Sequence, residues 1–295
     1  MQRSLTICCA LLALAINAGC EPEVPQAPDA GGGIFPPPQS GSSCLKGSGN
    51  FTDNGPYRVA TQDVTIGSSG QFTIFYPEPL ETNCKHPIVS WGNGTLVTGS
   101  DVYAFYQEHA ASYGIVVIAS HDDNVGTGEF LVAGIDYLLS ENKSPSSIFY
   151  QKLSTKVGTS GHSQGGAGAD RAASHPNVEA EVNVEGSFGE APSGTAFLCL
   201  TGTEDINPAG CDEAVRGATS PAFLANWEGG DHISTATLLG YSTGDLGTRQ
   251  FMRLYSAWFR CFLADDGNAC AMFKGGTNCP LCRESGWSAI FAKNY

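Results

Sequence analysis

The sequence predicts an α/β fold in which helices cover both faces of one doubly wound, mostly parallel sheet. Short apolar strands alternate with segments of helical periodicity, and the wholly apolar run at 114–119 is typical of a central parallel strand. The 295 residues are 41% hydrophobic and 15% charged, as expected of a globular chain with a sizeable core. The net charge of −14 argues against nucleic acid or an anionic membrane surface as the main partner.

Residues 1–20 have the pattern of a signal peptide, with Arg3 ahead of an apolar stretch at 7–16. The segment ends in Ala-Gly-Cys, which resembles a bacterial lipobox and would make Cys20 a lipidated first residue. Asn17 departs from that pattern, because an aliphatic residue is usual there. Cleavage without lipidation is the alternative, so we expect either a secreted protein or an outer-membrane lipoprotein.

Residues 21–43 are rich in Pro, Gly and Ala and predict a linker. The folded domain is then expected at 44–295, with a loop-like, cysteine-rich tail from about residue 266. Beyond the signal peptide no apolar run is long enough for a membrane span. Any membrane contact would therefore pass through a lipid on Cys20.

Eight cysteines follow residue 20, an even number that predicts disulfides in an exported chain. A zinc site built on the C-x-x-C spacing at 279–282 is the alternative, although an oxidising compartment disfavours it. Proximity along the chain suggests two bridges and leaves two more to be divided among the last four cysteines. The suggested pairs are Cys44–Cys84 and Cys199–Cys211, and the other four are Cys261, Cys270, Cys279 and Cys282.

The expected elements follow one another with few long gaps. The first two strands alternate apolar and polar residues around a glycine-serine turn, which predicts an antiparallel pair, and later strands are short apolar runs that end near glycine or acidic residues. The helices show apolar residues three and four apart. We expect strands at 57–65, 70–77, 87–91, 114–119, 155–160, 180–185, 195–200 and 223–227, and helices at 101–112, 127–139, 164–175 and 248–263.

A G-x-S-x-G motif, Gly161-His162-Ser163-Gln164-Gly165, joins one predicted strand to the next helix. Small residues on both sides let the chain turn sharply and hold the Ser163 hydroxyl clear of the sheet. The bare motif occurs by chance in glycine-rich chains, but its strand and helix context indicates a nucleophile elbow.

A nucleophilic serine needs a histidine base that an acid orients, and in this context the chain order is serine, acid, histidine. His232 lies in the loop after the strand at 223–227, where a base is expected. Asp205 follows the strand at 195–200 and is the predicted acid, with Glu204 as the alternative.

Two backbone N–H groups are expected to stabilise an oxyanion, those of Gln164 and Asn93, with Gly94 as the alternative to Asn93. The predicted elements nearly fill the intervals from Ser163 to Asp205 and from there to His232. No room remains for a cap domain, so we expect an open groove.

The walls of this groove are predicted to come from Trp91, Phe188 and His121, although each of these side chains could equally belong to the packed core. They lie at or after the ends of different predicted strands, and strands of a parallel sheet bring their carboxyl ends to one edge.

Three motifs together resemble the capless bacterial α/β-hydrolases of the cutinase and polyester (PET) hydrolase type, relatives of dienelactone hydrolases and chlorophyllases. They are G-H-S-x-G-G at 161–166, T-G-x-x-D-x-x-P at 201–208 and G-G-x-H at 229–232. The resemblance implies a single α/β-hydrolase domain and a monomeric serine esterase without metal or cofactor. Its substrate would be a carboxylic ester, including polymeric esters.

By this resemblance Ser163 is the nucleophile, Asp205 the acid and His232 the base. Gln164 stands where the polyester hydrolases usually have Met, and Phe188 stands near their Trp. A feruloyl or acetyl xylan esterase is the alternative within enzymes. A non-catalytic binding lipoprotein on the same fold is the alternative of another class.

Overall fold

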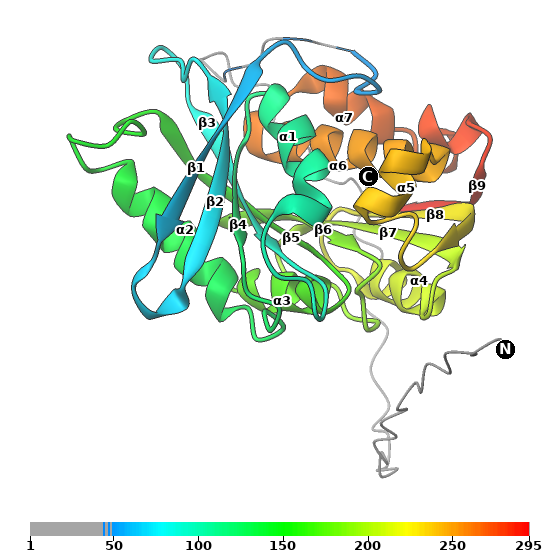
Figure 1. The fold of residues 1–295 in the computed structure, drawn as a ribbon. Coiled ribbons are helices and arrows are strands. Elements are labelled where there is room, and N and C mark those ends of the chain that lie inside the picture. The colour runs from blue at the N-terminus through cyan, green and yellow to red at the C-terminus, as the bar shows by residue number, and fades with distance from the viewer. Residues whose placement is uncertain (1–43, 45–46, 48, 295) are drawn as a thin grey trace, which may run out of the picture. The chain divides into compact units, whose positions relative to one another are not determined.

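The nine-stranded sheet of the computed structural model has the order β1-β2-β4-β3-β5-β6-β7-β8-β9 (Figure 1). The structure describes residues 44, 47 and 49–294, so the predicted signal peptide and linker lie outside it. Strands β4, β3, β5, β6, β7 and β8 run parallel to one another, as predicted for an α/β fold, whereas β2 and β9 pair antiparallel with β4 and β8. The strands are β1 (Arg58–Thr65), β2 (Gln71–Glu78), β3 (His86–Gly92), β4 (Val116–Ser120), β5 (Leu153–His162), β6 (Val178–Val184), β7 (Ala196–Glu204), β8 (Ala222–Asp231) and β9 (Trp287–Lys293).

Helices cover both faces of this sheet. Trp91 of β3 lies in the large core under α1 and α6, whereas its strand neighbour Ile88 packs under α2. Alternate side chains of a strand point to opposite faces, so one apolar strand serves both layers. The helices are α1 (Ala104–Ser112), α2 (Glu129–Glu141), α3 (Gln164–Ala172), α4 (Pro208–Gly217), α5 (Leu238–Thr243), α6 (Leu246–Ala264) and α7 (Gly267–Phe273).

The sequence predicted a loop-like, cysteine-rich tail from about residue 266, and this prediction is wrong. The tail forms α7 and then β9, which pairs antiparallel with β8 and becomes the last strand of the sheet. Two further helices, α4 and α5, were also not predicted from the sequence. These elements are short, and α4 and α7 each carry a cysteine that a disulfide fixes against a neighbouring element, so tertiary links outweigh weak local periodicity.

Four disulfides confirm the predicted set. Both suggested pairs are present, and the zinc alternative is wrong for the C-x-x-C segment, because its two sulfurs are bonded to each other and are not free thiolates. The bridges are Cys44–Cys84, Cys199–Cys211, Cys261–Cys270 and Cys279–Cys282.

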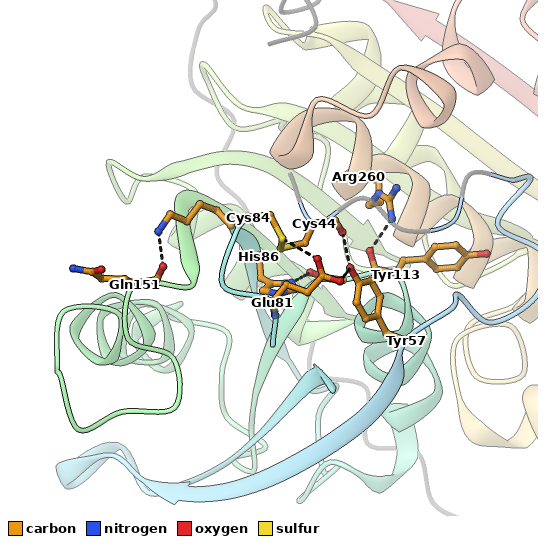
Figure 2. The surroundings of a disulfide bond; sticks show 10 residues. Cys44, Tyr57, Glu81, Cys84, His86, Tyr113, Gln151 and Arg260 are labelled. Carbon is orange, nitrogen blue, oxygen red and sulfur yellow. Dashed lines mark hydrogen bonds between the residues drawn. A yellow bond between two sulfur atoms is a disulfide. The ribbon is translucent and has the colours of Figure 1, made fainter. Parts of the chain in front are cut away.

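The bridge between Cys44 and Cys84 fastens the first described residue to the loop before β3 (Figure 2). Tyr57 donates its hydroxyl to Glu81 at 3.1 Å, and the Glu81 N–H donates to His86 Nε2 at 3.1 Å. The start of the domain is therefore held by a covalent link and by polar contacts around it. Within the described part of the chain, no helix is both long and apolar enough to cross a bilayer.

Candidate functional site

Ser163 stands alone between β5 and α3, at the edge where the parallel strands end. Its φ of 55° and ψ of −120° are strained for a residue with a side chain, as a sharp strand-to-helix turn requires. The turn needs glycines around it. A Cβ on Gly165 would lie 2.0 Å from the Gly92 carbonyl oxygen, and one on Gly186 would lie 2.2 Å from the Ser163 carbonyl oxygen.

The loops after β7 and β8 bring an acid and a base to this serine. His232 Nε2 lies 2.9 Å from Ser163 Oγ, and His232 Nδ1 lies 2.6 Å from Asp205 Oδ1. Asp205 also accepts hydrogen bonds from Thr201 Oγ1 at 2.8 Å and from the Ile206 N–H at 2.7 Å. The structure therefore joins the three residues that the sequence selected in one hydrogen-bonded row.

Asp231, beside the histidine, serves the loop itself. Its carboxylate accepts from the N–H groups of Ile233 and Ser234 and from the Ser234 hydroxyl. These bonds, the Ser234 hydroxyl first, lower the pKa of Asp231. The charged carboxylate of Asp231 thus stabilises the turn that carries His232.

His162, the residue before the serine, is buried and was not singled out by the sequence. Its Nδ1 lies 2.9 Å from the Tyr103 hydroxyl, and its Nε2 lies 2.8 Å from the carbonyl oxygen of His232. Burial, and after it the neighbouring His232, lower the pKa of His162 to about 3. Burial raises the pKa of Tyr103 to about 12. Both groups are therefore neutral over the ordinary working range of pH.

Glu185 lies behind the row, one residue after β6. Its side chain is fully buried, Oε2 lies 3.7 Å from His162 Nε2, and neither carboxyl oxygen has a hydrogen-bond partner. Burial, followed by the charges of Asp205 and Asp231, raises the pKa of Glu185 well above its ordinary value. The buried surroundings of Glu185 therefore favour the protonated form of this carboxyl.

Two groups of described residues have the composition of a metal site, but the ring nitrogens of one and the sulfurs of the other already have partners. His162, Glu185 and His232 place possible ligand atoms within 4.8 Å of one another, as do Cys44, Cys84 and His86. The four ring nitrogens of the first group are all hydrogen-bonded, and the sulfurs of the second form a disulfide.

An apolar groove of about 500 Å³ runs past Ser163 and His232. The sequence analysis missed its most exposed apolar side chains, which come from α5 and the loop before it. The signal was present as the pair Leu238-Leu239 shortly after the predicted base. The groove is lined by Gly94, Thr95, Val97, Val102, Tyr103, His162, Ser163, His232, Ile233, Thr237, Leu238 and Leu239.

Two predicted wall residues lie elsewhere. Trp91 is fully buried and packs against Tyr103 and Tyr106, because its position on β3 points it into the core under α1. His121 lies with Nε2 2.7 Å from Thr73 Oγ1 and borders a different hollow, near the β1–β2 hairpin. The predictions for Trp91 and His121 are therefore wrong.

Phe188, the third predicted wall residue, is 73% exposed. It does not line the apolar groove but a second hollow of about 420 Å³, together with Ala167 and Asp170 of α3. This hollow adjoins the helix that begins at the nucleophile, so a role of Phe188 in binding stays a prediction.

The structure places the three predicted oxyanion donors in different surroundings. Gln164 is the first residue of α3, directly after Ser163, as expected. Asn93 is fully buried, and its side-chain amide donates inward to the carbonyl oxygens of Gly99 and Ser120. The N–H of Gly94 donates to the Tyr103 hydroxyl at 3.2 Å. The Gly94 N–H is therefore not free, whereas a role of the Asn93 backbone N–H stays a prediction.

Comparison with known proteins agrees with this geometry. A family model described as PET hydrolase-like matches residues 38–188, which include β1 to β6 and the serine turn. An S-formylglutathione hydrolase of Arabidopsis thaliana is 30% identical over 132 residues, which cover 36% of this chain. The matched region spans 46% of that relative's length.

Proposed function

The chain belongs to the PET hydrolase-like family of α/β-hydrolases, and on that premise we propose that it hydrolyses carboxylic esters with Ser163 as nucleophile. The observation that carries the proposal is the row of Ser163, His232 and Asp205, with contacts of 2.9 and 2.6 Å. A free serine hydroxyl is a weak nucleophile, and an adjacent base oriented by an acid is the arrangement that activates it.

In the proposed reaction Ser163 Oγ attacks the ester carbonyl carbon while His232 Nε2 takes the hydroxyl proton. The imidazolium then returns this proton to the leaving alcohol, and an acyl-enzyme remains. Water, deprotonated by the same nitrogen, attacks the acyl carbon and releases the acid. Asp205 stabilises the imidazolium through Nδ1 and keeps the ring in the reactive tautomer.

We assign the oxyanion donors to the backbone N–H groups of Gln164 and Thr95. Gln164 follows the nucleophile at the start of α3, where helix N–H groups lack intrahelical partners. Thr95 replaces Asn93 in this assignment, because it is exposed and lines the groove. Each such donor is worth about 3 kcal/mol of transition-state stabilisation.

The apolar lining of the groove favours esters with bulky apolar groups, as in cutinase-like or polyester (PET) hydrolase-like enzymes. Leu239 is 58% exposed and Ile233 is 50% exposed beside the reacting groups. We retain the prediction that no cap domain encloses them, so that a long chain could lie across the site. A feruloyl or acetyl xylan esterase is the second candidate, because Phe188 offers an aromatic side chain on the neighbouring hollow.

Replacing the nucleophile tests the proposal directly. The wild-type protein should hydrolyse short-chain p-nitrophenyl esters and should be labelled by a fluorophosphonate probe, whereas Ser163→Ala should lose both properties. Full activity in Ser163→Ala would overturn the mechanism. A wild-type protein that neither hydrolyses esters nor takes the label would instead be a non-catalytic binding protein on this fold.

A change in the groove tests the substrate class. Leu239→Ser should raise KM for long acyl p-nitrophenyl esters about fivefold and leave acetate esters nearly unaffected, because about 1 kcal/mol of apolar contact is lost only with long chains. Ile148→Ser is the matched control, since Ile148 is also exposed but lies outside the groove. Comparing release from polyester film with release from feruloylated xylan then separates the two candidates.

We also propose that the protein is exported, on the support of its four disulfides and the signal-peptide pattern. Mass spectrometry of the mature N-terminus would show either a diacylglycerol-modified Cys20 or a free new terminus. A retained Met1 in protein from the native host would contradict export.

A further inference from the structure

We propose that Tyr103 and His162 are positioning residues, which join the loop after β3, the nucleophile turn and the loop of the base through one directed hydrogen-bond chain. This inference rests on the proposed function, because it concerns how His232 is held for catalysis. The chain runs from Gly94 through Tyr103 and His162 to the backbone of His232.

The direction of every bond in this chain follows from its two ends. A carbonyl oxygen only accepts, so His162 Nε2 must carry the proton that is donated to His232 O across 2.8 Å. In a neutral imidazole Nδ1 is then an acceptor, and the Tyr103 hydroxyl donates to it across 2.9 Å. The hydroxyl oxygen in turn accepts the Gly94 N–H at 3.2 Å.

Burial holds His162 in the form that this chain needs. Its side chain is 3% exposed, and the low pKa keeps the ring neutral. The charged and titratable groups that face it are His232 and Asp205 of the reacting row and the carboxyl of Glu185. A protonated His162 would donate from both nitrogens and would force the Tyr103 hydroxyl to reverse.

The residues fit together closely at the first link. A Cβ on Gly94 would lie 2.8 Å from the Tyr103 hydroxyl oxygen and 2.9 Å from His162 Nδ1, so a glycine is required here. Tyr103 and His162 both also line the groove. The hydrogen-bond chain thus borders the groove and connects two segments that are far apart in sequence, those of Gly94 and His232.

The consequence for catalysis lies in the placement of the base. The ring of His232 must stay 2.9 Å from Ser163 Oγ while it accepts and returns a proton. The ring of His162 lies 4.8 Å from that of His232, and its N–H holds the His232 backbone from below. A small displacement of a reacting group lowers the reaction rate by a large factor. Loss of the hydrogen bond from His162 to the His232 backbone should therefore lower kcat more than it changes KM.

Tyr103→Phe removes only the hydroxyl in the centre of the chain. We expect kcat for p-nitrophenyl acetate to fall about tenfold while KM changes less than twofold, since the groove keeps its shape. The matched control is Tyr106→Phe. Tyr106 is equally buried, packs on the same Trp91 ring, and carries a hydroxyl with no hydrogen-bond partner, so kcat should not change.

The ring ¹⁵N spectrum of labelled histidines provides a readout that packing alone would not move. His162 should show the Nε2–H tautomer in the wild-type protein and in Tyr106→Phe, and a mixture of tautomers in Tyr103→Phe. His162→Phe identifies its signals among the six histidines. In a double-mutant cycle, Tyr103→Phe should add little to the loss caused by His162→Phe, because both changes break one chain.

Equal loss of kcat in Tyr103→Phe and Tyr106→Phe, or an Nδ1–H tautomer of His162 in the wild-type protein, would overturn the inference. So would fully additive effects in the double-mutant cycle. Failure of the proposed function has a different signature. In that case the wild-type protein would hydrolyse no ester, while the tautomer measurement would still decide whether the hydrogen-bond chain exists.

Discussion

Two buried carboxyl groups lie at the carboxyl ends of the neighbouring strands β6 and β7. Only one of these carboxyl groups accepts hydrogen bonds. Asp205 follows β7 and accepts from Thr201, from the Ile206 N–H and from His232. Glu185 follows β6, and both of its oxygens lack a hydrogen-bond partner. Both side chains are almost completely removed from solvent, at 3% and 0% exposure.

The difference shows that a position at the edge of the sheet does not by itself make an acid catalytic. Three donors compensate a carboxylate for the water it has lost, whereas a buried carboxyl without donors keeps its proton. Because its surroundings favour the protonated form, Glu185 competes weakly with Asp205 for the charge on His232. One carboxyl can therefore orient the base while the other serves only as packing.

Replacing the paired carboxyl should have the largest effect. In Asp205→Asn the amide can donate to His232 Nδ1 and favour the unreactive tautomer, so we expect kcat to fall about 10³- to 10⁴-fold. Steady-state hydrolysis of p-nitrophenyl acetate measures it. Glu204→Gln changes the exposed carboxylate of the preceding residue, is the control and should retain activity. A loss below tenfold in Asp205→Asn would mean that Asp205 is not the acid.

Removing one donor should have an intermediate effect. Thr201→Val deletes the 2.8 Å bond to Asp205 Oδ2, and we expect kcat to fall about three- to tenfold and stability to fall by about 1 kcal/mol. Thr159→Val is the control, because Thr159 is equally buried but its hydroxyl has no hydrogen-bond partner. If both variants behaved alike, donors would not explain the difference between the carboxyls.

Replacing the carboxyl that lacks donors should have the smallest effect and the opposite sign. The raised pKa of Glu185 stabilises the fold below the unfolded value of 4.5, and this contribution is lost as pH rises through the folded-state pKa. Glu185→Gln should therefore match wild type at pH 4 and exceed it at pH 8, with Tm higher by about 2–4 °C for each ~1 kcal/mol.

Thermal unfolding of Glu185→Gln at the two pH values, with disulfides intact, makes this measurement. Glu228→Gln changes an exposed carboxylate and should show no such pH-dependent gain. A Glu185→Gln protein that is destabilised at pH 8 would show that Glu185 is ionised and paired, and the comparison with Asp205 would fail.

The residues of the hydrogen-bonded row, Ser163, His232 and Asp205, could be predicted because a local sequence pattern marks each of them. Small residues around Ser163 specify the turn, and Asp205 and His232 follow apolar strands. The parallel sheet then brings the three strand ends to one edge. The α/β fold followed from the same alternation of strands and helices.

The groove could not be predicted in the same way, because its walls depend on which face of a strand a side chain occupies. Trp91 follows the same apolar pattern whether it faces the core or the groove, and only the packing of α1 decides. The α5 leucines were missed since a six-residue helix has little periodicity. The role of His162 depends on Tyr103, which is 59 residues away in sequence.

The position of β9 at the edge of the sheet has a consequence for self-association of the protein. Residues Trp287–Lys293 occupy the hydrogen-bonding edge of β8, the strand that leads into His232. A protein shortened before β9 would present that edge bare, and an unpaired edge recruits strands from other molecules. Such a truncated chain should self-associate more readily than the chain with β9, because β8 is longer and more buried than the strand that covers it.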